Sequence, residues 1–199
     1  MKILAHLLLY IITCHICVVS SAHSNSFGMP FNKIPDADAA YMSIYEVRVG
    51  DYQAYAQAED ISWNKPAFEQ SNEHPAVNVS WMDAVNYCAW LTHHERKKGM
   101  INENGYYRLP TKAEWQRANN VPSDYGELKM NKEIAYPWKG KWPPPENFAN
   151  YGSDLKVDMY EHTSPVGSFE PNENGFYDMN GNVWEWCSDR YSNSADLRI

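Results

Sequence analysis

The stretch GFYDMNGNVWEWCSD, residues 175–189, decides how this sequence is interpreted. It places two tryptophans and three acidic residues among glycines and asparagines. Glycine and asparagine disfavour the interior of a regular helix or strand, whereas large aromatic rings favour burial against a folded surface. The segment therefore predicts an irregular loop that the rest of the fold fixes in one conformation.

An irregular loop leaves carbonyl oxygens without partners, and buried carbonyls must find them. Calcium accepts several hard oxygen ligands, main-chain carbonyls included. Asp178 and Glu185 offer carboxylates, and the carbonyls of Met179, Gly181 and Val183 alternate between them. The spacing is compatible with a calcium loop. The alternative is a turn that carries two solvated acids and no ion.

Tryptophans are the second feature of the chain that predicts packing. Trp184 and Trp186 are expected to pack against the protein and to fix the loop. Trp81, Trp90 and Trp115 are likewise expected in the core.

The composition is that of one folded domain. The chain has 199 residues, of which 44% are hydrophobic and 14% aromatic, and this is enough to bury a core. Its formal net charge is −8. Because the protein is acidic and shows no basic stripe, no nucleic-acid partner is expected.

Residues 1–22 have the pattern of a secretory signal peptide. Lys2 gives a positive start, residues 3–19 are mostly apolar, and small residues at 20–22 offer a cleavage site. We therefore expect a secreted or periplasmic protein with no membrane span after cleavage. The alternative is an uncleaved N-terminal anchor.

The segment after the signal peptide is weakly patterned. Residues 23–40 are polar and contain proline, which predicts a flexible lead-in. Alternation over residues 45–49 predicts a strand, and residues 50–56 predict a short helix. Residues 59–77 are expected to form a loop.

Two further helices are predicted from their capping signals. Ser80 and Asp83 form a capping-box variant ahead of an apolar helical periodicity with a basic last turn. Thr111 and Glu114 cap a second helix over residues 112–119. The chain therefore predicts an α+β fold with a long irregular second half, and such a half needs metal, disulfides or buried side chains to be ordered.

Two cysteines, Cys88 and Cys187, lie outside the signal peptide. In an oxidising compartment a disulfide between them is one reading, although the sequence does not show whether their Cα atoms come close enough. The flanking aromatic residues favour the other reading, in which both are buried thiols.

Several blocks of sequence add a resemblance to these observations. They are YEVRVGDYQAY (45–55), HPAVNVSWMDAVNYCAWL (74–91), YRLPTKAEWQRA (107–118), YPWKG (136–140) and TSPVGSFEPNENGFYDMNGNVWEWCSD (163–189). In this order they resemble the formylglycine-generating enzyme family, also called the sulfatase-modifying factor family. The resemblance implies a C-type-lectin-like α+β fold that is low in regular structure and stabilised by calcium.

The resemblance also implies two structural calcium sites and a further ligand, Glu46. The ligands of the first site are Asp178, Met179, Gly181, Val183 and Glu185, and Asp178 stands where the best-known members have asparagine. The ligands of the second site are Asn150, the carbonyl of Tyr151, Asp158 and the carbonyl of Tyr160.

Enzymes of this family oxidise a cysteine of a sulfatase-like client protein to formylglycine with dioxygen, and two of their own cysteines bind copper(I). Those cysteines belong to a C-terminal block that the sequence up to Ile199 does not contain. We therefore expect a domain over residues 41–199 that is incomplete at its C-terminus, has no catalytic residue of its own, and takes copper only if that block exists.

Three functions stay open at this point. The first is the oxidase with its closing block, the second is a non-catalytic ligand- or protein-binding module on the same fold, and the third is a gene fragment without function. Family membership does not choose among them, because one fold supports several functions.

Overall fold

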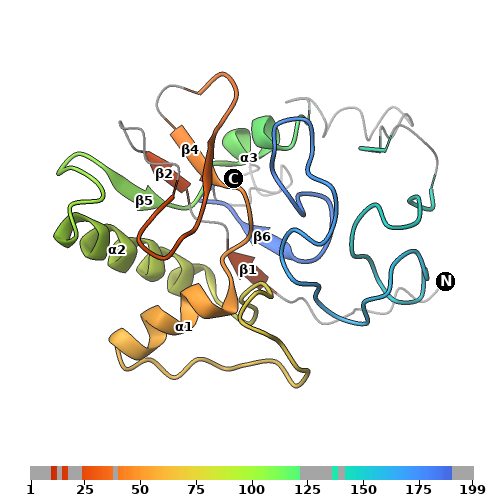
Figure 1. Ribbon diagram of the computed structural model, residues 1–199, viewed down its shortest axis with the longest axis horizontal. Coiled ribbons are helices and arrows are strands. Elements are labelled where there is room, and N and C mark those ends of the chain that lie inside the picture. The colour runs from red at the N-terminus through yellow and green to blue at the C-terminus, as the bar shows by residue number, and fades with distance from the viewer. Residues whose placement is uncertain are drawn as a thin grey trace, which may run out of the picture.

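The computed structural model describes residues 10–12, 15–17, 24–37, 40–121, 136–138 and 142–189. Short helices and strands occupy the chain up to residue 118, and residues 142–183 run as irregular loop (Figure 1). The mixed helix and strand content confirms the predicted α+β character. The long loop has almost no regular structure, so side-chain packing and polar contacts must order it.

The main sheet has the strand order β3-β4-β2-β5, and all neighbouring strands are antiparallel. In that order the strands span Phe31–Lys33, Ala40–Ser43, His15–Cys17 and Tyr106–Arg108. A second, two-stranded sheet pairs β1 (Tyr10–Ile12) in parallel with β6 (Trp184–Trp186). Strands this short add few ladder hydrogen bonds, so packing has to supply most of the order.

Strands β1 and β2 lie within residues 1–22, which the sequence predicts to be a signal peptide. The backbone of β2 pairs with β4 on one side and with β5 on the other. Cleavage after residue 22 would therefore leave two facing strand edges without this partner, and their backbone groups would need another one. Cleavage itself stays a prediction.

The helices confirm the capping predictions. Helix α2 spans Trp81–Lys97, and the Ser80 hydroxyl accepts a hydrogen bond from the Asp83 amide at 3.2 Å while the Asp83 carboxylate accepts from the Ser80 amide at 3.1 Å. Helix α3 spans Lys112–Ala118 and has the corresponding box from Thr111 and Glu114. Each box satisfies amides that the first helical turn leaves without intrahelical partners.

The predicted strand over residues 45–49 is wrong. The chain bends at residues 44–45, and helix α1 already begins at Val49 and ends at Ala58. Arg48 is its N-cap residue, and its amide donates to the Asp51 carboxylate at 3.2 Å. The alternating pattern was therefore overridden by a local helix start that involves a long-chain residue rather than the usual serine or aspartate.

The flexible lead-in expected over residues 23–40 also differs from the structure. Its described residues include β3, and the side chains of Met29, Phe31 and Ile34 are buried in the core. Residues 24–30 are further attached to helix α2, because the Ser26 amide donates to the carboxylate of Glu95 at 3.1 Å. This segment belongs to the folded domain.

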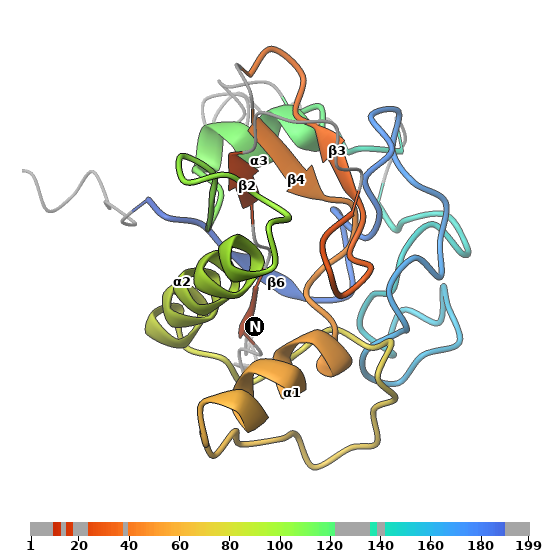
Figure 2. The ribbon, with the colours of Figure 1, turned by 60° about the vertical axis from the view of Figure 1, so that its left-hand side comes forward.

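The core consists of two clusters on either side of the sheet. The larger cluster joins α1, α2 and β5, with Tyr52, Tyr87 and Leu91 fully buried. The smaller cluster consists of Ile34, Ala40, Met42, Ala118, Phe176 and Met179. It connects β4 and α3 to the loop of residues 175–189, and the sheet lies between α2 and the long irregular loop (Figure 1, Figure 2).

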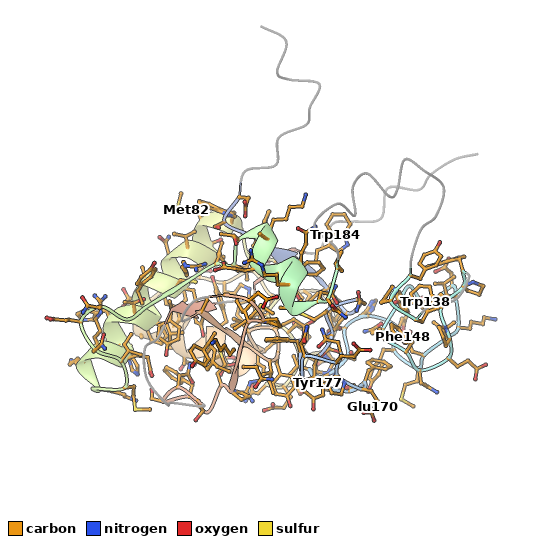
Figure 3. The ribbon with its side chains drawn as sticks, turned by 90° about the horizontal axis from the view of Figure 1, so that it is seen from above. Met82, Trp138, Phe148, Glu170, Tyr177 and Trp184 are labelled. Carbon is orange, nitrogen blue, oxygen red and sulfur yellow. The ribbon has the colours of Figure 1, made fainter. Side chains whose placement is uncertain are left out.

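The tryptophan prediction holds only in part. Trp186 packs against the larger cluster and donates from Nε1 to the Val79 carbonyl at 3.0 Å. Trp184 is 69% exposed and Trp81 is 38% exposed, so neither is a core residue. The indole ring of Trp81 is held by a hydrogen bond instead, because its Nε1 donates to the Cys187 carbonyl at 2.9 Å. In Figure 3, Trp184 and Met82 both lie along the upper edge of the molecule, and both are exposed.

Cys88 is buried and Cys187 partly buried, and the structure shows no disulfide between them. The reading as buried thiols is therefore the one that the structure shows. Within the described residues no helix combines the length and the apolar character needed to cross a bilayer.

Candidate metal centre

Backbone conformation fixes the loop of residues 178–185. Asp178 and Asn182 both have left-handed φ angles, 57° and 61°, which asparagine and aspartate tolerate better than most residues. At Gly181 a Cβ atom would lie 2.6 Å from the Asn150 carbonyl oxygen and 2.8 Å from the Ala149 Cβ. Because the obstacle includes backbone, only glycine fits at this position.

The close approach at Gly181 brings the two predicted calcium sites together. The Asn182 amide donates to the Asn150 carbonyl at 2.9 Å, and the Asn150 side-chain amide donates to Asn182 Oδ1 at 3.2 Å. Residues that are about thirty positions apart in sequence thus form one region, which the sequence analysis treated as two separate sites.

Buried carboxyl groups without partners mark the first predicted site. Glu46 is 1% exposed, and neither of its carboxyl oxygens has a hydrogen-bond partner. Asp178 is 6% exposed; its Oδ2 accepts from the Gly167 amide at 2.6 Å, but its Oδ1 has no partner. Unpaired buried carboxylates are strongly disfavoured in a protein interior, so their presence needs an explanation.

The pKa values of Glu46 and Asp178 are both raised, as expected for buried carboxyl groups. Burial raises the pKa of Glu46 well above its usual range, and the charges of Asp178 and Glu185 raise it further. Burial also raises the pKa of Asp178 to about 6. The charges of Asp178 and Glu185 thus both act on the buried Glu46, where a cation would offset their repulsion.

Glu185 is attached to helix α3, because its carboxylate accepts a hydrogen bond from Trp115 Nε1. In the described part of the chain, no three or more His, Cys, Asp or Glu side chains lie close enough to hold a metal ion by themselves. A cation at Glu46, Asp178 and Glu185 would therefore require main-chain oxygens as additional ligands.

Two of the carbonyl oxygens predicted as calcium ligands, those of Met179 and Gly181, each accept one hydrogen bond. The Met179 carbonyl accepts from the Asn119 side-chain amide at 3.2 Å, and the Gly181 carbonyl accepts from the Val183 amide at 2.7 Å. A carbonyl oxygen has a second lone pair, so these bonds leave room for a cation. The donor set contains only hard oxygens, and it fits calcium better than a soft or nitrogen-preferring metal.

The second predicted set is brought together in a different way. Asp158 Oδ2 accepts from the Tyr151 amide at 2.9 Å, and Asp158 Oδ1 accepts from the Tyr160 amide at 2.8 Å. The carboxylate thus binds amides of the two residues whose carbonyls were expected as ligands. Because both of its oxygens have partners, no unpaired charge marks a cation site here.

Asn182 is a site residue that the sequence analysis did not single out. Its Oδ1 accepts from the Ser164 amide at 2.9 Å as well as from Asn150, and its Nδ2 donates to the Ser164 carbonyl at 3.3 Å. It joins three loop segments beside the buried acids. The available signal was an asparagine directly after an obligatory glycine, where a left-handed conformation is common.

The thiols of this chain do not fit a copper(I) pair. Copper(I) prefers a pair of thiolate ligands, whereas Cys88 lies buried in α2 and forms no disulfide with Cys187. Burial raises the pKa of the Cys187 thiol to about 12, so it does not offer a thiolate at neutral pH. Neither matches the soft, paired site that copper requires.

Comparison with known proteins gives the same family as the sequence blocks. The family model described as the sulfatase-modifying factor enzyme 1-like domain matches residues 22–197. The formylglycine-generating enzyme of Thermomonospora curvata is 35% identical over 126 residues, which cover 60% of this chain and 34% of that protein. The inactive C-alpha-formylglycine-generating enzyme 2 of Bos taurus is 36% identical over 152 residues, which cover 71% and 43%.

A solved structure shows the same fold. PvdO from Pseudomonas aeruginosa superposes with a TM-score of 0.57 and 30% identity, over 83% of this chain and 59% of that chain. The chain therefore spans less than half the length of the Thermomonospora curvata and Bos taurus relatives, 34% and 43% respectively. Since the family model extends over residues 22–197 and includes the loop that surrounds the buried acids, the chain belongs to the sulfatase-modifying factor, or formylglycine-generating enzyme, family.

Proposed function

We propose that this chain is an exported, calcium-stabilised domain of the formylglycine-generating enzyme family. The ion would be held by Glu46, Asp178 and Glu185 together with the carbonyls of Met179, Gly181 and Val183. The observation that carries the proposal is the pair of buried acids, Glu46 and Asp178, because both carboxyl oxygens of Glu46 and the Oδ1 of Asp178 lack hydrogen-bond partners. A divalent cation would remove their mutual repulsion and connect the irregular loop to the start of the domain.

The role of the ion in this proposal is structural. Residues 175–189 have only three residues of strand and no helix, yet Phe176 and Met179 are part of a core cluster. Because ordering backbone costs conformational entropy, an ion that binds only the ordered loop would stabilise the folded state.

We further propose that this chain acts without oxidase chemistry of its own, as a binding or accessory domain whose partner is a sulfatase-like client protein. The thiols described with side chains do not fit copper(I), because Cys88 is buried within α2 and burial raises the pKa of Cys187 to about 12. The relative from Bos taurus is named an inactive enzyme, which supports a role for this fold apart from oxidation. The competing proposal is the oxidase itself, which requires a copper-binding cysteine pair.

Thermal melts of the full chain test the calcium proposal. We expect the melting temperature in millimolar calcium to exceed that in EDTA, because an ion at a hundredfold excess over its Kd stabilises the folded state by about 2.7 kcal/mol. Asp178→Ala should abolish the increase, whereas Glu103→Gln, at an exposed acid in the turn between α2 and β5, should leave it intact. Equal melting temperatures with and without calcium would exclude the proposed site.

An oxidation assay tests the functional part separately. The full chain, incubated with copper(I), dioxygen, a thiol reductant and a cysteine peptide from a sulfatase, should leave the peptide mass unchanged. Loss of mass that corresponds to conversion of the thiol to an aldehyde would show that the oxidase reading is correct.

A further inference from the structure

A cavity of about 830 Å³ lies between helix α3, the loop of residues 145–149 and the loop of residues 169–180. Pockets that bind small molecules typically have volumes of roughly 300–1,000 Å³. The cavity opens beside the metal centre and shares Asp178 and Met179 with its wall. It is nevertheless a separate space, because most of its wall comes from residues that the metal centre does not use.

Aromatic side chains form much of the cavity wall. They are Trp115, Tyr136, Phe148, Phe169 and Phe176. Together they provide an apolar surface that suits a hydrocarbon chain and electron-rich ring faces that suit a cation.

The aromatic surface continues outward from the cavity. Tyr136 stacks on Trp138 with ring centroids 4.5 Å apart and planes at 7°, and Trp138 contacts Phe148 at 5.4 Å. Trp142 lies beyond them and is 52% exposed. Trp138 and Phe148 project at the same end of the molecule in Figure 3. A bound molecule would therefore meet aromatic rings both inside the cavity and at its entrance.

The charged residues of the cavity are mostly acidic. Glu146, Glu170, Glu173 and Asp178 line it, and Lys112 is the one basic side chain among the described lining residues. Glu146 and Glu170 are exposed and form no ion pair with any described residue. Asp178 adds a buried carboxyl group with an unpartnered oxygen. Low-dielectric walls lined by one sign of charge concentrate ions of the opposite sign.

We propose that this cavity binds an organic cation, namely an ammonium or guanidinium group carried on an aliphatic stem. The stem packs along the aromatic wall, and the charged group lies near the carboxylates of Glu146 and Glu170. An anion would be repelled by the same carboxylates, and a neutral apolar molecule would gain nothing from them. Two sources have this chemistry: a free polyamine, and a lysine or arginine side chain of a basic peptide.

Calorimetric titration of the full chain tests the proposal with matched probes. The probes are 1,5-diaminopentane, 1-pentanol as its uncharged counterpart, and a terminally blocked peptide with one central lysine. We expect at least one of the cationic probes to bind, 1-pentanol to bind more weakly, and affinity to fall with added salt. Binding of only the diamine identifies a polyamine as the ligand, and binding of only the peptide identifies a basic peptide.

Variants locate the binding site. Because an exposed charge pair contributes about 0.2–1 kcal/mol, the double variant E146Q/E170Q should weaken binding by roughly 2- to 30-fold. Both residues are exposed, so the variant should fold, and an unchanged melting temperature checks this. E161Q, at an exposed acid outside the cavity wall, is the matched control and should not change the affinity.

Three results would overturn the proposal: no binding of either cationic probe, equal affinity for 1-pentanol, or unchanged affinity in E146Q/E170Q. The titrations are performed both in calcium and in EDTA. If the unaltered chain binds neither cationic probe but still shows the calcium-dependent rise in melting temperature, this inference alone is refuted, because Glu146 and Glu170 are not ligands of the proposed calcium site.

Discussion

At the scale of single residues, Glu46 has an unfavourable environment for a charge. It is 1% exposed, has no hydrogen-bond partner for its carboxyl oxygens, and is repelled by Asp178 and Glu185. A protein keeps such a group when something else compensates it, and a bound cation is the simplest compensation for an acid among acids.

We predict that Glu46→Gln removes most of the stabilisation by calcium. The amide has the same shape but no charge, so the calcium-dependent gain in the free energy of unfolding should shrink by about 1–3 kcal/mol. In EDTA the variant should be at least as stable as the wild type, because a repelled carboxyl group is gone. Urea titrations with and without calcium measure both quantities, and Glu103→Gln, at an exposed acid outside both predicted ligand sets, is the control. An unchanged calcium gain would place Glu46 outside the site.

Gly181 is a position where packing alone dictates the residue. We predict that Gly181→Ala destabilises the protein by about 1–3 kcal/mol, because the added Cβ would overlap the Asn150 carbonyl and Ala149. Gly152→Ala is the matched control, since its Cβ would meet only the side-chain oxygen of Asp154 at 2.8 Å, and that exposed side chain can move. Equal destabilisation of the two variants in urea titrations would contradict the steric argument.

At the scale of elements, helix α3 depends on one side chain. Glu114 accepts hydrogen bonds from the Arg108 guanidinium at 2.7 and 2.6 Å and from the Thr111 amide at 2.8 Å. Burial acts to raise the pKa of Glu114, but the bonds from Arg108 and Thr111 outweigh it and lower the pKa to about 2. The carboxylate therefore links β5 to the first turn of α3 in its charged form.

We predict a pH-dependent contribution from Glu114. Because its pKa is lower in the folded state than its ordinary value of 4.5, the contribution is fully present above about pH 4.5 and is lost as the pH falls towards 2. Glu114→Gln should cost about 1–3 kcal/mol at pH 7, and its difference from the wild type should shrink between pH 4.5 and 2. Urea titrations across this range measure it. A difference independent of pH would contradict an ionised partner for Arg108.

The helices and strands show which local sequence signals are sufficient to predict secondary structure. The boxes at Ser80 and Thr111 predicted both helix starts correctly, because the cap hydrogen bonds join residues only three positions apart. The alternation at residues 45–49 predicted a strand wrongly, since strand formation depends on a partner strand that the local sequence does not contain. The prediction of a flexible lead-in over residues 23–40 was wrong for a similar reason, because β3 is stabilised by β4 and by the core.

At the scale of the whole molecule, the N-terminal segment connects fold and export. The backbone of residues 15–17 lies between β4 and β5, and the same residues belong to the predicted signal peptide. If export removes them, the edges of β4 and β5 need a different partner strand. The N-terminus of the exported protein therefore shows both whether residues 1–22 are cleaved and whether β2 remains between β4 and β5.

We predict that protein recovered from the exported fraction starts at or near His23, because small residues precede it in a signal-peptide pattern. Intact-mass measurement and N-terminal sequencing determine the start. Protein from a strain in which export is blocked provides the comparison and should retain residues 1–22. A start at Met1 in the exported fraction would contradict cleavage and would leave β1 and β2 in the fold.

The sequence by itself determined the family, the α+β character, the caps of α2 and α3, and the identity of Asp178 and Glu185 as paired acids of one segment. These follow from short-range patterns and from motifs that lie within a few residues of each other. Only the tertiary structure decided that Glu46 lies buried with Asp178, that Gly181 abuts Asn150, and that Trp184 is exposed. These contacts join residues far apart in the chain, and burial and electrostatic coupling depend on distance in space rather than in sequence.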